Sequence, residues 1–285
     1  MSLGAVVALF AAVAYGAADF CGGLASRRTP ANAVLVVSQL AGLVLLGIIL
    51  PFTGTHFYAR DLPVAALAGC AAAAGIGLLY AALAVGRMGV VSPITAVVSA
   101  SVPVAFGALM GERISALAAA GCAVALVAIV MISAGGARDP LATTGRGWRE
   151  PGVVIALGSG LAIGVLYVAL AHGRPDGRLA IVAEMRLVSI PLLFGFARLT
   201  RRPFAVPRAA LGIVAAAGVL DMCANVGYAI AARLAPLAIA AVLTSLYPAS
   251  TVLLAFVVLR ERLTRLQAAG VACAVAGVAC ISLGS

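Results

Sequence analysis

Two stretches of the chain, MGERISALAAAGCAVALVAIVMIS at 110–133 and LRERLTRLQAAGVACAVAGVACIS at 259–282, resemble each other. When the chain is shifted by 149 residues, Glu112-Arg113 falls on Glu261-Arg262, and the Ala-Ala-Gly at 119–121 falls on that at 268–270. Apolar matches alone are weak evidence in so apolar a chain. A Glu-Arg pair at the same place between two apolar runs, with a hydroxyl residue shortly after it, indicates an internal duplication.

The chain around this repeat divides into ten apolar runs. Each is close to the ~20 residues needed to cross ~30 Å of hydrocarbon. Only 10% of the residues are charged and 64% are hydrophobic, against roughly 25% charged in soluble domains. Backbone groups in lipid must pair within their own segment, so helices are expected. We predict an all-α membrane protein of the cell (inner) membrane with ten spanning helices, at 3–23, 32–51, 63–85, 89–110, 114–134, 151–171, 179–198, 208–232, 236–259 and 264–283.

A polar segment at 135–150 separates the ten runs into five and five. We therefore predict one repeat at 1–143 and a second at 150–285. Five crossings are an odd number, so the second repeat enters the membrane upside down and both termini lie on the same side. Inverted repeats are typical of transporters, although duplication also builds bundles that transport nothing.

The net charge of +10 does not predict nucleic-acid binding. The chain has no lysine, and its arginines lie mostly in the short connections, without a basic patch of interleaved aromatic residues. Arginines in short loops act as topology anchors. More of them lie in the odd-numbered connections, so we predict that these connections are cytoplasmic and that both termini lie outside.

The sequence gives no sign of an enzyme, a cofactor or a metal centre. It has no phosphate-cradling loop, metal-ligand spacing or nucleophile elbow. The six cysteines lie in apolar runs without ligand spacing, which favours packing over disulfide or metal chemistry. Any transport must then proceed by facilitated diffusion, exchange or coupling to an ion gradient.

Two longer stretches carry a family resemblance. They are GRMGVVSPITAVVSASVPVAFGALMGERIS at 86–115 and ARLAPLAIAAVLTSLYPASTVLLAFVVLRERLT at 232–264. They resemble the EamA-type branch of the drug/metabolite transporter superfamily, and the resemblance covers nearly the whole chain as two copies. In that family a Pro often stands thirteen residues before the Glu of the turn, as Pro248 does before Glu261; Ser99 departs from this pattern. The resemblance implies a substrate path surrounded by helices one to four of each half, with the fifth and tenth peripheral.

The eighth predicted span contains an ionisable residue near its middle, Asp221. Charged groups inside a span are costly, so each is a functional candidate. Asn225 and Tyr228 follow at i+4 and i+7, which puts all three on one helical face. We interpret this stripe as a substrate or proton site; a structural hydrogen-bond clip between helices is the alternative.

Further ionisable candidates lie in the seventh and first spans. Glu184 and Arg186 face away from each other on their helix, so each needs a partner elsewhere. Asp19 is one possible partner for Arg186, although the two lie near opposite membrane faces. Arg186 could also snorkel or hold an anionic group of a substrate.

Prolines inside the fourth and ninth spans remove backbone hydrogen bonds and kink helices. The freed carbonyls can be satisfied by nearby hydroxyls or by water and substrate in a cavity. We predict that these helix breaks line the pathway, at Pro93, Ser99, Pro103, Thr244 and Pro248.

Together these observations predict a secondary transporter that exports or exchanges a small polar metabolite such as an amino acid, with or without proton coupling. The alternative is a membrane-embedded structural or sensory protein without flux. The expected partners are the lipid bilayer and a small-molecule substrate, with no nucleic acid, and the chain is expected to act as a monomer or homodimer.

Overall fold

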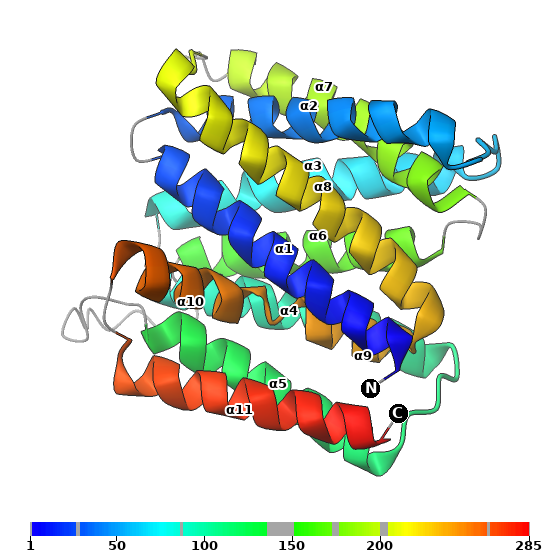
Figure 1. The fold of residues 1–285 in the computed structure, drawn as a ribbon, viewed down its shortest axis with the longest axis vertical. Helices are drawn as coiled ribbons and strands as arrows, with labels where there is room; N and C mark the ends of the chain where they lie inside the picture. Colours follow the sequence, from blue (N-terminus) through cyan, green and yellow to red (C-terminus); the bar gives the residue numbers. More distant parts are fainter. Residues whose placement is uncertain are drawn as a thin grey trace.

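The computed structural model describes residues 2–26, 29–85, 88–135, 151–172, 177–199, 205–260 and 263–284. In these residues the chain forms one bundle of helices joined by short connections (Figure 1). The first half contains α1 (Leu3–Ser26), α2 (Ala31–Ile49), α3 (Leu62–Val85), α4 (Met88–Leu109) and α5 (Ala116–Gly135). The second contains α6 (Pro151–Ala171), α7 (Arg178–Leu199), α8 (Leu211–Leu234), α9 (Leu237–Thr244), α10 (Tyr247–Leu259) and α11 (Arg265–Gly284).

The described helices have the length and composition of membrane spans. Nine runs are long and apolar enough to cross a bilayer, and a shorter apolar helix at Ile94–Leu109 lies within α4. The prediction of an all-α membrane protein is therefore confirmed.

The internal repeat is visible in the helix boundaries. A shift of 149 residues carries α3 (Leu62–Val85) onto α8 (Leu211–Leu234). The same shift carries α5 (Ala116–Gly135) onto α11 (Arg265–Gly284). Because the offset found in one turn also places other helices of the half, the duplication extends well beyond the turn.

The contact between α5 and α11 has the self-complementary form of a twofold axis. A Cβ atom placed on Gly121 would lie 2.8 Å from Cγ1 of Ile281. A Cβ atom on Gly270 would likewise lie 2.8 Å from Cγ1 of Ile132. These two contacts are exchanged by the 149-residue shift, as contacts across a twofold axis must be. The small residues allow the two helix backbones to approach closely.

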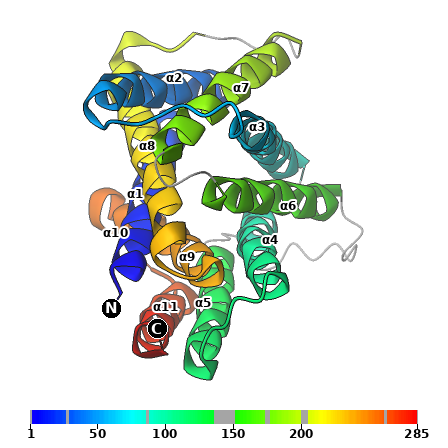
Figure 2. The same cartoon turned by 90° about the vertical axis from the view of Figure 1, so that its right-hand side faces the viewer.

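Both termini lie on one side of the bundle, which we call the terminus side. Figures 1 and 2 show the two chain ends next to each other. The hydroxyl of Ser115, at the start of α5, donates a 2.6 Å hydrogen bond to the carbonyl of Gly284 near the C-terminus. Figure 2 also places α5 and α11 together at one end of the bundle, away from α2, α3 and α7.

The ninth span consists of two helices rather than one. α9 ends at Thr244 and α10 begins at Tyr247. Pro248 explains the break, because it lacks an N–H and its ring would clash with the carbonyl four residues earlier, that of Thr244. The prediction of a helix break at this point is thus met in the backbone.

The fourth span, by contrast, continues as one helix past its prolines. α4 runs from Met88 to Leu109 and includes Pro93, Ser99 and Pro103. Ser99, which stands where the second half has Pro248, keeps its backbone N–H, and its hydroxyl donates a 2.9 Å hydrogen bond to the carbonyl of Ala96. The side chain of Pro93 lies outside the described residues. The two halves therefore differ at the position that breaks the ninth span.

Candidate functional site

A cavity of about 120 Å³ lies in the middle of the bundle. Its polar lining comes from α1, α6, α7, α8 and the start of α10, and its apolar lining comes mainly from α3 and α6. We call it the central cavity. Its polar residues are Tyr15, Asp19, Tyr167, Arg186, Asp221, Asn225 and Tyr247.

Asp221 and Arg186 form an ion pair across the central cavity wall, between α8 and α7. The Arg186 side chain is 3% exposed and that of Asp221 is 30% exposed. The guanidinium is therefore buried away from water, whereas the carboxylate is partly exposed to the cavity. Asn225 donates from its amide nitrogen to the Asp221 carbonyl at 2.7 Å and to the carboxylate at 3.3 Å. The partner of Arg186 is therefore Asp221, and not Asp19 as considered from the sequence.

One buried nitrogen of Arg186 has no hydrogen-bond partner among the described residues. Nη2 donates to Asp221, whereas Nε is buried and has no hydrogen-bond partner among the described residues. A buried donor without an acceptor is rare in native structures and calls for an explanation.

Asp19 lies on α1 and lines the same cavity as Arg186 and Asp221. Its side chain is exposed, and the described residues offer it no hydrogen bond or ion pair. A carboxylate held inside a membrane protein without a partner is costly unless water or a ligand reaches it. The cavity lining thus contains one acid without a partner among the described residues and one cation that is paired with a second acid.

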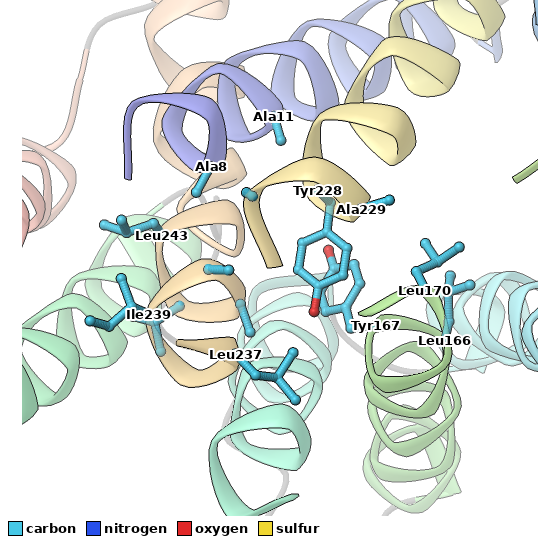
Figure 3. Close-up of a cluster of buried hydrophobic side chains, with 14 of the residues drawn as sticks. Ala8, Ala11, Leu166, Tyr167, Leu170, Tyr228, Ala229, Leu237, Ile239 and Leu243 are labelled. Atoms are coloured by element: carbon cyan, nitrogen blue, oxygen red, sulfur yellow. The ribbon is translucent and has the colours of Figure 1, made fainter. Parts of the chain in front are cut away.

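Four tyrosines gather around the central cavity. Tyr15 has its ring centroid 6.5 Å from that of Tyr167 and 6.4 Å from that of Tyr247. Tyr167 and Tyr228 are closer still, with centroids 4.5 Å apart and ring planes at 32°. Figure 3 shows these last two rings side by side among buried residues of α1, α6, α8 and α9. Aromatic faces of this kind pack against apolar groups and attract cations.

Next to the central cavity lies a second space of about 130 Å³, which we call the vestibule. The two share Asp19, Ile76, Leu79 and Asp221. The vestibule continues along the last turns of α1 and the first half of α2, where Gly22, Gly23, Val34 and Leu35 line it. It therefore leads toward the face opposite the termini, which we call the connection-one side.

The terminus side of the central cavity is closed. Tyr228 is fully buried and stacks on Tyr167, and every residue of α9 is buried. The Glu112 carboxylate, from the turn between α4 and α5, accepts the backbone N–H of Leu237 at 2.9 Å and of Ala238 at 3.4 Å. Glu112 therefore caps a helix of the other half and ties the two halves together.

Several predicted site residues lie away from the cavity lining. Glu184 points elsewhere than Arg186; it is buried, and its Oε2 has no hydrogen-bond partner in the described part of the chain. Thr244 donates a 3.4 Å hydrogen bond to the carbonyl of Ala8 in α1. Ser99, Pro103, Thr244 and Pro248 are not among the residues that line the central cavity or the vestibule. Glu261 lies outside the described residues.

Sequence reasoning missed several polar residues of the cavity system, among them Tyr15 and Gln39. Tyr15 was not selected, although it precedes Asp19 by four residues and so lies on the same face of α1. Gln39 was also missed; it lines the vestibule and accepts a 2.8 Å hydrogen bond from the Ser189 hydroxyl. Only the spacing of Tyr15 from Asp19 could have been read from the sequence.

A larger groove of about 680 Å³ lies elsewhere, between α2, residues 53–56, α7 and α8. Its α8 residues are Met222, Cys223, Val226 and Ile230, and none of the described residues that line it is acidic or an arginine. Despite its size, it lacks the paired charges of the central cavity, so we place the candidate site in the central cavity.

Comparison with known proteins agrees with this architecture. The family model described as the EamA-like transporter family matches residues 2–134 and again 150–283. A solved structure, titled only "Crystal structure of protein", superposes with a TM-score of 0.83 at 17% sequence identity and covers 99% of this chain and 98% of its own. At that identity the likeness concerns the fold alone. No match was found among curated proteins.

Proposed function

Because the chain belongs to the EamA-like transporter family, we propose that it is a secondary transporter of a small zwitterionic metabolite such as an amino acid. The protein is a multi-pass membrane protein of a transporter family; the solute, its exchange or proton coupling, and the cell membrane as its location are the proposed part. No phosphate-cradling sequence is present, so ATP hydrolysis is not expected to drive it.

The observation that supports the choice of solute is that a carboxylate without a partner among the described residues and a guanidinium line the same cavity. The Asp19 carboxylate can bind an ammonium group, and the Arg186 guanidinium, which also lines the cavity, can donate to a carboxylate. An amino acid carries both groups on one carbon atom. The volume of about 120 Å³ suits such a solute, whereas drug-sized ligands need cavities of roughly 300 Å³ or more.

Charge and surroundings support the same reading. When both carboxylates are ionised, Asp19, Asp221 and Arg186 together carry one excess negative charge, which favours a solute with a cationic group. Tyr15 and Tyr247 line the cavity together with Asp19, and their ring faces can contact the ammonium group of the solute. The apolar wall formed by Ile76 and Leu79 can contact a side chain.

Counterflow in proteoliposomes tests this function. The purified protein is reconstituted, loaded with unlabelled amino acids one at a time, and assayed for uptake of the labelled compound with and without a proton gradient. We expect exchange of at least one amino acid, and a roughly ten- to hundredfold loss in Asp19→Asn, because a charge-assisted hydrogen bond contributes about 1.5–3 kcal/mol.

Leu161→Ala is the matched control, because Leu161 lies on α6 with 54% of its surface exposed and outside the cavity lining. It should transport like the unmodified protein. The absence of exchange for every amino acid, with folded protein in the vesicles, would refute the proposed solute class. Full activity of Asp19→Asn would refute the role of the carboxylate.

A further inference from the structure

The internal repeat relates the open side of the cavity to its closed side. Helices α1, α2 and α3 correspond to α6, α7 and α8 at the 149-residue offset. Ala18 on α1 and Leu79 on α3 both line the open vestibule. Their counterparts are Tyr167 on α6 and Tyr228 on α8, which are the two rings stacked on the closed side.

Equivalent helices of the two halves are therefore arranged differently in this structure. On the terminus side α6 packs against α8. On the connection-one side the vestibule lies between α1 and α3. Inverted repeats can exchange their arrangements around a fixed site, which turns an open side into a closed one. In the exchanged state α6 and α8 would part, and a vestibule would open on the terminus side.

Glu184 acquires a role in this exchanged state. It corresponds to Leu35, which lines the open vestibule. In the structure Glu184 is 8% exposed and its Oε2 is buried without a partner in the described residues. Such an atom is rarely left unsatisfied without a functional reason. Opening between α6 and α8 would expose the carboxylate to water and to a cationic group.

We infer that the terminus side holds a second vestibule, walled by α3, α6, α7 and α8 and closed by Tyr167 against Tyr228, in which Glu184 binds the cationic group of the solute. The inference rests on the proposed transport function. Asp19 is the acid on the open side, and its counterpart in the other half is Val168. Asp19 and Glu184 therefore do not correspond to each other in the repeat. The pathway would then offer an ammonium group one carboxylate on each side of the central cavity.

Thiol labelling tests the vestibule without measuring transport. Ala68 is fully buried, and its counterpart Ala217 lines the open vestibule. Ala68→Cys is made in a variant whose six native cysteines are replaced by alanine, and a membrane-impermeant thiol reagent is applied to sealed vesicles from either side. Tyr167→Ala should raise labelling from the terminus side about two- to twelvefold, the population shift expected from losing an aromatic pair. Tyr167→Phe keeps the ring and should leave labelling unchanged.

Two controls make this result decisive. Leu161→Cys, at the middle of α6 on its lipid-facing surface, should stay unlabelled both with and without Tyr167→Ala. Size-exclusion chromatography checks that each variant is folded. Labelling of Ala68→Cys that is insensitive to Tyr167→Ala, or that occurs only from the connection-one side, would overturn the proposed vestibule.

The role of Glu184 is tested with two thiol reagents of similar size, one carrying a trimethylammonium group and one neutral. In Ala68→Cys/Tyr167→Ala, Glu184→Gln should lower the ratio of cationic to neutral labelling rates about fivefold, as expected for one charge at close range in water. An unchanged ratio would refute the binding of a cationic group. Because both readouts are independent of flux, a failure of counterflow would refute the transport proposal and leave the vestibule standing.

Discussion

Asp221→Asn is expected to destabilise the protein more than Arg186→Gln does, although the two changes break the same ion pair. The difference follows from burial. Asp221→Asn leaves a guanidinium on a side chain that is only 3% exposed, and removing one partner of a fully buried pair costs about 3–5 kcal/mol. The asparagine oxygen can still accept one hydrogen bond, so we expect a loss of about 3 kcal/mol.

Arg186→Gln leaves the opposite member of the pair, and that member is better placed to stand alone. The Asp221 side chain is 30% exposed to the cavity and keeps the hydrogen bond from Asn225. Water can therefore solvate the carboxylate, and we expect a loss of about 1 kcal/mol. The double variant should be less destabilised than the sum of the two single variants, because neither charge then remains.

Thermal unfolding of the purified proteins in one detergent measures the difference. At roughly 2–4 °C per kcal/mol, Asp221→Asn should unfold about 4–8 °C below Arg186→Gln. Counterflow of the same samples shows whether flux is lost beyond the loss of folded protein. If Arg186→Gln lowers the unfolding temperature as much as Asp221→Asn or more, the reasoning from the buried guanidinium is wrong.

Three further outcomes are expected. Gly218→Ala should lower the unfolding temperature, because its Cβ would strike the backbone carbonyl of Ser38 and force α2 and α8 apart at a cost of about 1–3 kcal/mol. Gly212→Ala, on the same helix with open space around it, should be neutral or stabilising. Equal effects of the two substitutions would contradict the packing argument. Glu112→Ala should cost about 0.5–1 kcal/mol in thermal unfolding, because α9 loses its cap, and an unchanged unfolding temperature would argue against that cap. Ser285→Cys, in the cysteine-free variant, should react with an impermeant thiol reagent added to intact cells, since the arginine distribution places both termini outside; labelling only after lysis would reverse the orientation.

The sequence alone determined the class of the protein and its repeat. Apolar runs of spanning length leave the backbone few options in lipid, so ten helical spans could be read directly. The Glu-Arg turns gave the offset of 149 residues, which the boundaries of α3 and α8 then reproduce. Pro248 indicated the break in the ninth span through its missing N–H and its ring. The proline alone did not decide it, because α4 continues as one helix past Pro103.

Only the tertiary structure decided which charged groups meet. Asp221 is a conspicuous residue in an apolar span, but its pairing with Arg186 joins α8 to α7 and depends on how these helices are rotated and inclined. Side-chain spacing fixes neighbours within one helix, whereas helices in lipid choose their partners through small-residue contacts such as Gly218 against α2. For the same reason Glu112 could be expected to cap a helix, but not one in the other half of the chain. The sequence also could not show that the cavity opens toward one face, because that property belongs to the arrangement of the two halves and equivalent helices adopt both forms in this structure.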